Sequence, residues 1–324
     1  MDIKIQLNGP GGIDRLQVAP CAPQAPGPGD IRIRHDAIGV NFIDIYFRLG
    51  LYPLPNLPTV LGVEGAGIVE AIGDGVTDLM PGDRVAYAGA PVGAYAATRL
   101  LPHARAIRLP DGIATRVAAA NMLRGLTAHM LLFRVYPVEP ATTVLVHAAA
   151  GGLGGILVRW AKHLGATVIG TASSPAKAAT ARGNGADHVI VGRDADIANE
   201  VRALTGGQGV DYAIDGIGGN MLEKTLGSVR RFGTVASVGQ AAGPIPPLSV
   251  EALGPVRSLS LARPSVMAYS ADPEVYPAAA QDLFAAIERG IAADIGAVYP
   301  LADAARAQAD LEAGRTTGSL LLIP

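Results

Sequence analysis

The chain has 324 residues, a formal net charge of −2 and a single cysteine, Cys21. A chain without global basic charge or a run of Lys and Arg gives no electrostatic reason to expect a nucleic-acid partner. One cysteine excludes an intramolecular disulfide framework. No signal-peptide pattern or long apolar run is present, which argues against a secreted or membrane-spanning protein. We therefore expect a cytoplasmic protein, long enough for two domains.

The first third of the chain has the pattern of a small β domain. Residues 31–35 alternate apolar and polar side chains, as a half-exposed antiparallel strand does. Clusters of Gly and Pro interrupt the region at 27–30, 52–58 and 80–83. Short strands with frequent turns favour a compact, barrel-like β domain before residue 124.

The segment 144–155, VLVHAAAGGLGG, carries the strongest functional signal. An apolar strand, Val144–Val146, stops at small residues, and an apolar-periodic helix follows at once. The spacing Ala148-x-x-Gly151-x-x-Gly154 is a variant of the GxGxxG turn, whose backbone N–H groups approach a dinucleotide pyrophosphate at a helix N-terminus. We expect a nucleotide site here, with a merely structural turn as the alternative. The predicted apolar face of the helix consists of Leu153, Ile156, Leu157, Trp160, Ala161 and Leu164.

The next predicted strand, Thr167–Ala172, indicates which nucleotide is bound. An NAD site normally places Asp or Glu at the end of this strand, but the chain continues with Ser173, Ser174 and Lys177. Two hydroxyls and an ammonium suit a 2′-phosphate, and each charge-assisted hydrogen bond contributes about 1.5–3 kcal/mol. NADP is therefore favoured over NAD. The alternative is a Ser N-cap followed by a solvated Lys.

Strands and helices continue to alternate as far as residue 264, and about six strands fit between 124 and 264. This alternation predicts a doubly wound parallel sheet. The further strands are predicted at 188–191, 210–214, 233–239 and 258–262, and the helices at 194–204 and 220–231. After these come predicted helices at 277–289 and 302–313, and then a last strand, Ser319–Ile323. That strand has no parallel-sheet context, so we expect it to return to the N-terminal domain.

Several motifs together carry a family resemblance. They are Gly39–Asp44 with Tyr46, Gly50–Pro53, Gly62–Gly67, Pro81–Val85, Gly125–Ala128, Ala148–Gly154 and Ala262–Ser265. With these motifs the chain resembles, from end to end, the zinc-free medium-chain dehydrogenase/reductases of the quinone oxidoreductase (zeta-crystallin-like) type. The resemblance implies an α/β fold, in which an NADP-binding Rossmann domain (124–264) follows a GroES-like β-barrel catalytic domain (1–123 and 265–324). The cofactor would lie in a cleft between the domains.

The resemblance also implies the site residues, with NADPH as cofactor. Those near the nicotinamide and substrate would be Asn41, Tyr46, Tyr52 and Arg263. Those that contact the cofactor would be Asn41, Thr127, Ala150, Gly151, Gly152, Leu153, Gly154, Ser173, Lys177, Gly216, Val238, Gly239, Gln240, Ser265 and Arg315. A tyrosine that some relatives place near the 2′-phosphate is replaced by Gly192, so NADP selection depends more on Lys177, with help from Arg193 or Arg315.

Metal chemistry is not expected. Zinc alcohol dehydrogenases resemble the chain but carry Cys where Asn41 stands and His where Val63 stands, so that only Glu64 of their motif remains. A catalytic zinc needs three Cys, His or carboxylate ligands, and the six histidines show no ligand spacing. We expect His147 to be a packed strand residue, and Glu64 and Asp44 to be structural hydrogen-bonders.

Without a metal, a conjugated carbonyl acceptor needs the least help, because its own conjugation stabilises the added electrons. A phenol or amide donor near its oxygen suffices, as Asn41, Tyr46 and Tyr52 would supply. We therefore predict an NADPH-dependent quinone reductase that acts on a small-molecule quinone or conjugated carbonyl compound. The alternatives are an alkenal or enone double-bond reductase, and a nucleotide-binding redox sensor or structural protein without turnover.

Arg263 either anchors the domain junction or approaches the nicotinamide. The predicted edge strand 258–262 would pair with its copy in a homodimer.

Overall fold

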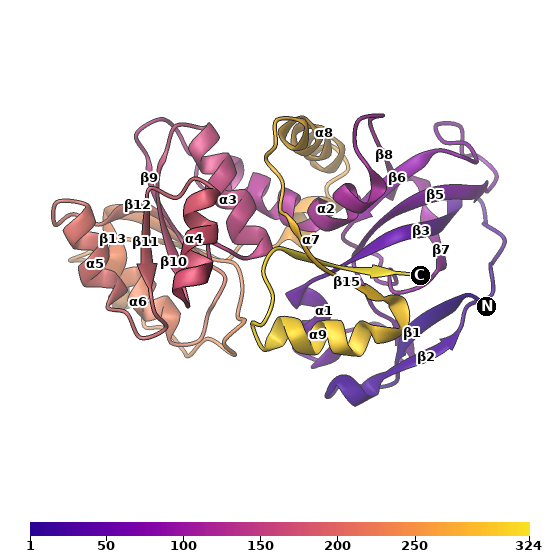
Figure 1. The fold of residues 1–324 in the computed structure, drawn as a ribbon, viewed down its shortest axis with the longest axis horizontal. Coiled ribbons are helices and arrows are strands. Elements are labelled where there is room, and N and C mark those ends of the chain that lie inside the picture. The colour runs from indigo at the N-terminus through magenta and orange to yellow at the C-terminus, as the bar shows by residue number, and fades with distance from the viewer. The chain divides into compact units, whose positions relative to one another are not determined.

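The computed structural model describes all 324 residues, which form two compact units. We call residues 1–126 together with 266–324 the N-terminal unit, and residues 127–265 the central unit. Both ends of the chain lie in the N-terminal unit (Figure 1). No helix is both long and apolar enough to cross a membrane.

The N-terminal unit is built on antiparallel strands, as its Gly- and Pro-rich sequence predicts. Its seven-stranded sheet has the order β15-β16-β3-β5-β6-β8, and β7 also pairs with β3. A three-stranded sheet has the order β2-β1-β4. The strands are β1 (Ile3–Leu7), β2 (Leu16–Pro20), β3 (Asp30–Val40), β4 (Thr59–Val60), β5 (Glu64–Ile72), β6 (Arg84–Ala88), β7 (Thr98–Pro102), β8 (Ile107–Arg108), β15 (Ile295–Pro300) and β16 (Ser319–Ile323).

The return of the last strand to this unit is confirmed. Strand β16 pairs antiparallel with β3, placing Leu321 opposite Gly39. Strand β15 was not predicted: none of its side chains is buried, so its sequence lacks the pattern of a buried strand. The helices of the unit are α1 (Phe42–Arg48), α2 (Thr115–His129, which crosses the boundary between the units), α7 (Val266–Ala271), α8 (Val275–Glu288) and α9 (Ala304–Glu312).

The central unit contains the predicted doubly wound sheet. Six strands lie in the order β11-β10-β9-β12-β13-β14, and every pair is parallel. This order puts the first strand in the middle of the sheet, with successive strands added outward on each side, as in dinucleotide-binding folds. The strands are β9 (Thr143–Val146), β10 (Thr167–Ala172), β11 (His188–Val191), β12 (Val210–Asp215), β13 (Val229–Ser237) and β14 (Ser260–Ala262).

Helices cover this sheet and bury its apolar residues. Helices α3 (Gly152–His163) and α4 (Pro175–Gly183) pack on β10, and α6 (Met221–Ser228) packs on β12 and β13 (Figure 1). Helix α5 (Ile197–Leu204) packs on α6. One core cluster consists of Leu145, Ile169, Ile190, Ile197, Val201, Val210, Ala213, Leu222, Leu226 and Val235.

The predicted helix 220–231 is too long and needs correction. Helix α6 ends at Ser228, and β13 already begins at Val229, which pairs with Val210. Phe232 then takes a left-handed conformation (φ 61°), so that β13 is irregular before it continues from Gly233. The sequence signal that favoured helix was local, whereas the pairing with β12 decides the structure.

Candidate functional site

The glycine turn between β9 and α3 has the geometry of a phosphate-binding turn. Ala148 takes a left-handed conformation (φ 50°), and the Gly151 N–H donates to the Ala148 carbonyl at 2.8 Å. A Cβ at Gly154 would lie 2.3 Å from that same carbonyl oxygen, so only glycine allows α3 to start this close to the strand. No side chain caps α3, which leaves its leading N–H groups available to an anion.

A buried network of polar side chains holds this turn in place. His147 is buried, with Nε2 2.8 Å from Thr225 Oγ1 and Nδ1 3.1 Å from Thr171 Oγ1. Thr171 Oγ1 also accepts a hydrogen bond from the Ala148 N–H at 3.2 Å. Burial lowers the pKa of His147. The ring is therefore a packed hydrogen-bonding group that fixes the turn, as expected from the sequence.

The end of β10 carries the residues predicted to read the ribose. Ser174 caps α4: its Oγ accepts from the Lys177 N–H at 3.4 Å. Ser173 is exposed and Lys177 is half-buried, and no Asp or Glu lies between Ala172 and Lys177. The alternative of a Ser N-cap thus holds for Ser174, while Ser173 and Lys177 follow the end of β10, where a site of this kind binds the ribose.

Five further predicted residues come together at the carboxyl ends of β12 and β13. Asp215 Oδ1 accepts from the Ile217 and Gly218 N–H groups, at 2.8 and 3.0 Å. A Cβ at Gly239 would lie 2.5 Å from the Gly216 carbonyl oxygen, so the two loops touch backbone to backbone. The predicted residues at this edge are Gly216, Val238, Gly239, Gln240 and Arg263. Carboxyl ends of parallel strands are where ligands bind in such sheets.

Arg263 is held within the central unit. Its Nη1 donates to the Ser237 Oγ at 2.9 Å and to the Ser237 carbonyl at 3.1 Å, and it lies 3.4 Å from the Gly239 carbonyl oxygen. The side chain thus ties β14 to the end of β13. Ser265 is exposed two residues later, and Thr127 is buried in α2.

The N-terminal unit brings three predicted residues onto one segment, α1 and the turn after it. Tyr46 is buried and Tyr52 is half-buried; their rings meet edge to face with centroids 5.5 Å apart. The Phe47 ring also meets the Tyr52 ring edge to face, with centroids 5.9 Å apart. Asn41, immediately before α1, is buried, and its Nδ2 donates to Glu64 Oε1 at 2.6 Å. The fourth predicted residue of this unit, Arg315, is exposed and forms an ion pair with Asp310.

Two residues of the network around Asn41 were not predicted. Arg124 Nη1 lies 3.2 Å from Glu64 Oε1, and its Nη2 donates to the Val40 carbonyl at 2.6 Å. The Tyr95 hydroxyl donates to Asp44 at 3.0 Å. Arg124 stands in the apolar run AAANMLRGLTA, and a charge in such a run is the signal that could have identified it. Glu64 and Asp44 are hydrogen-bonders here, as expected.

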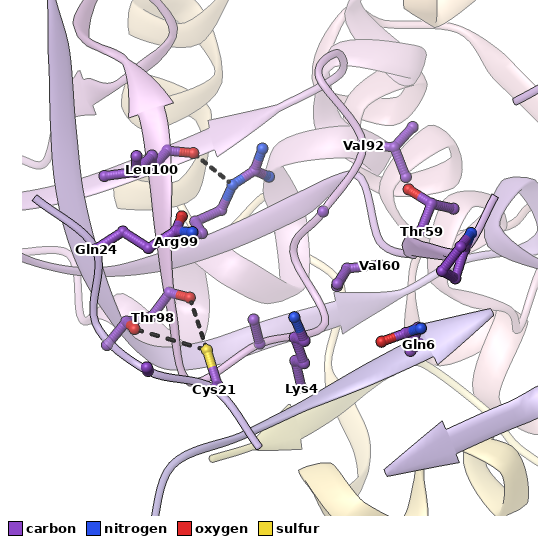
Figure 2. Close-up of a pocket in the computed structure, with 14 residues that line it drawn as sticks. Lys4, Gln6, Cys21, Gln24, Thr59, Val60, Val92, Thr98, Arg99 and Leu100 are labelled. Atoms are coloured by element: carbon purple, nitrogen blue, oxygen red, sulfur yellow. Dashed lines mark hydrogen bonds between the residues drawn. The ribbon is translucent and has the colours of Figure 1, made fainter. Parts of the chain in front are cut away.

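A separate groove of about 490 Å³ lies in the N-terminal unit (Figure 2). Lys4, Val60 and Arg99 line it, together with Cys21, whose thiol donates to the Thr98 carbonyl at 3.4 Å. No predicted site residue lines this groove. Nowhere in the chain do three His, Cys, Asp or Glu side chains gather in a way that could hold a metal ion.

Comparison with known proteins covers both units. Residues 27–111 match the family model for the alcohol dehydrogenase GroES-like domain, and residues 152–285 that for zinc-binding dehydrogenases. A quinone oxidoreductase of Pseudomonas aeruginosa is 44% identical over 322 residues, which is 99% of both chains. A 2-haloacrylate reductase of a Burkholderia species is 41% identical over 321 residues, 97% of this chain and 96% of that one. The structure of Escherichia coli quinone oxidoreductase complexed with NADPH matches with a TM-score of 0.96 at 39% identity, covering 99% of this chain and 100% of that one.

Proposed function

The chain belongs to the zinc-free quinone oxidoreductases among the medium-chain dehydrogenase/reductases, and from this we propose which of its residues carry the reaction. It is an NADPH-dependent quinone reductase. The observation in this chain that carries the assignment is the uncapped N-terminus of α3 behind the Ala148–Gly154 turn, and the missing acid after β10 adds the preference for NADPH. NADPH, when bound, supplies the hydride.

The residues of the central unit fit such a cofactor. Gly154 and Gly239 let α3 and the loop after β13 lie directly against neighbouring backbone, where any side chain would clash. We assign the pyrophosphate to the N–H groups of residues 150–154, and the 2′-phosphate to Ser173 and Lys177. Gly216, Val238, Gly239, Gln240, Thr127 and Ser265 complete the proposed contacts, with Arg315 as a further candidate. The role of Arg263 is to hold the end of β13 in shape through Ser237.

The acceptor is oriented, in this proposal, by Asn41, Tyr46 and Tyr52. A quinone gains negative charge on its oxygen as it is reduced, and a phenol or amide donor stabilises that charge. Support comes from packing: the Tyr52 ring contacts the rings of Tyr46 and Phe47, and these contacts restrict its movement. A donor already in place costs no reorganisation during the reaction.

Tyr52→Phe tests this assignment. The variant keeps the ring contacts and loses only the hydroxyl, so we expect kcat/KM for a quinone to fall about tenfold, as for the loss of one hydrogen bond of about 1.4 kcal/mol. Tyr299→Phe, which removes a hydroxyl bonded to Asp310 in the same unit, is the matched control and should keep full activity. Equal kinetics for the two variants would remove Tyr52 from the proposed site.

A conjugated carbonyl compound is the second candidate substrate. The similarity to a 2-haloacrylate reductase favours it, because a haloacrylate is a conjugated acid whose double bond is reduced. The same donors would then serve a carboxylate or carbonyl oxygen.

A homodimer and a cytoplasmic location belong to the same proposal. The homodimer is supported by the edge strand β14, which pairs on one side only, with β13.

A further inference from the structure

Asp44 is a buried carboxyl with hydrogen bonds on only one of its oxygens. Its Oδ2 accepts from the Asn41 N–H at 2.9 Å and from the Tyr95 hydroxyl at 3.0 Å. Its Oδ1 is buried and has no hydrogen-bond partner. An ionised carboxylate accepts hydrogen bonds on both oxygens, whereas a carboxylic acid accepts on its carbonyl oxygen and carries the proton on the other. Because Oδ1 has no partner in either form, the charges around Asp44 decide whether the carboxyl is neutral or ionised.

The charges around Asp44 leave it without a cation of its own. Asn41, Asp44, Glu64, Tyr95 and Arg124 form one buried cluster. Arg124 carries its only guanidinium, which contacts Glu64. Glu64 accepts three hydrogen bonds, from Arg124, from the Asn41 amide and from the Leu123 N–H. Burial raises the pKa of Glu64, and these three donors oppose that rise in part. Because a guanidinium stays charged, Glu64 is the carboxylate that balances it.

The other neighbours supply no second positive charge. Arg48, on the same helix as Asp44, is directed to Gln308 Oε1 at 2.8 Å and to Glu312 at 2.6 Å. Burial and the nearby Asp44 raise the pKa of Tyr95 well above its usual range, so its hydroxyl stays a donor. Burial therefore raises the pKa of Asp44 to about 7, against the smaller opposing effects of its two hydrogen bonds.

We propose that Asp44 is a positioning residue for the reduction of the acceptor, and that it acts in its neutral form. The proposal rests on the function given above, in which Asn41 lies beside the acceptor. Neutral Asp44 holds the Asn41 backbone while Glu64 holds the Asn41 side chain. An ionised Asp44 would add a second, unbalanced negative charge to this buried cluster. It would oppose the negative charge that develops on the acceptor, and it would compete with Glu64 for Arg124.

The test is the pH profile of kcat with NADPH and a quinone, between pH 6 and pH 9. Only the protonated fraction of Asp44 supports turnover, so the wild-type kcat should fall toward tenfold per pH unit at the alkaline end. Asp44→Asn imitates the neutral acid, accepting on its oxygen and carrying hydrogens at the other position. It should retain kcat within about threefold at pH 6 and lose the alkaline decline. Asp36→Asn, in β3 of the same unit, is the control and should keep the wild-type profile.

A second variant tests the role of neutral Asp44 by extending the pH range in which Asp44 stays protonated. Tyr95→Phe removes one of the hydrogen bonds that favour the ionised form of Asp44. The alkaline decline should therefore move upward by about 0.5–1 pH unit, as expected for one hydrogen bond. Because this variant changes the position of the decline, it remains informative if Asp44→Asn does not fold.

The outcomes separate this proposal from the function on which it rests. If the wild type reduces quinones and the variants share its pH profile, the role of Asp44 is overturned and the proposed function stands. If no quinone is reduced by any of the proteins, the proposed function fails and the catalytic role of Asp44 fails with it. The titration of Asp44 can then still be followed through stability. A carboxyl whose pKa is raised on folding from 3.8 to about 7 lowers the free energy of unfolding as pH rises between these two values, and Asp44→Asn should abolish that part of the decline.

Discussion

Lys177 is the single side chain on which cofactor choice depends most in this chain. It follows β10, where an NAD site would carry an acid, and Gly192 contributes no hydroxyl of its own. Lys177→Ala should weaken NADPH binding by about tenfold to a hundredfold and leave NADH binding nearly unchanged, as the loss of one charge-assisted hydrogen bond predicts. Dissociation constants for both nucleotides, measured by the fluorescence of the reduced nicotinamide, would show this.

Lys162→Ala is the matched control for Lys177, since it removes a lysine of the same unit that forms an ion pair with Asp187. An unchanged preference for NADPH over NADH in Lys177→Ala would assign the 2′-phosphate to other residues, with Arg193 and Arg315 as the next candidates.

Single residues also mark the limit of prediction from sequence. The residues of a local motif, such as Gly151, Gly154 and Ser174, are predictable because their neighbours along the chain define their role. Arg124 and Tyr95 are not, because their partners Glu64 and Asp44 lie far away in the sequence and only the folded structure brings them together. The neutral state of Asp44 likewise depends on how many donors and cations the fold places around it.

Among the elements, the turn from β9 to α3 has the strictest steric requirement. Gly154→Ala would put a methyl group 2.3 Å from the Ala148 carbonyl oxygen, which is backbone and cannot rotate away. We expect α3 to be displaced, with a loss of about 1–3 kcal/mol in unfolding free energy and of at least tenfold in NADPH affinity. Urea unfolding and a binding titration measure the two effects.

Gly183→Ala provides the control, since it is also a glycine of a central-unit helix but has open space around it. It should stabilise the protein slightly, by up to about 1 kcal/mol, because alanine favours helix. A loss in Gly183→Ala as large as that in Gly154→Ala would mean that the close contact with Ala148 is not the cause.

The elements that were predicted well are those with a strong local pattern. Strands Thr167–Ala172, His188–Val191 and Ser319–Ile323 are confirmed with the limits given, because an apolar run is followed by Ser, Gly or Pro in each case. The boundary between α6 and β13 was misplaced, because the pairing of Val229 with Val210 is a tertiary contact that no local pattern reports.

At the scale of the whole molecule, the alternation of strands and helices was enough to predict the class of the central sheet. The order of the strands in the N-terminal unit was not predictable, because antiparallel strands far apart in sequence pair there, such as β16 with β3.

The proposed homodimer belongs to this scale too. Phe232 is 76% exposed, and its N–H bonds to the Arg257 carbonyl in the segment that leads to edge strand β14.

Phe232→Glu should therefore convert a dimer into a monomer, since a charge would have to be buried at the contact. Sedimentation velocity gives the oligomeric state directly. Val18→Glu, at an exposed apolar residue of the N-terminal unit, should leave it unchanged. A wild type that sediments as a monomer at micromolar concentration would refute the dimer.

The most direct measurement is NADPH oxidation by the purified protein with 1,4-benzoquinone, 9,10-phenanthrenequinone and an α,β-unsaturated aldehyde side by side, with NADH in parallel and the reaction without enzyme subtracted. We predict turnover of both quinones, with NADPH preferred over NADH. Turnover of the aldehyde alone would contradict quinone reduction and place the enzyme among the double-bond reductases, while tight NADPH binding without oxidation by any acceptor would contradict an enzymatic role altogether.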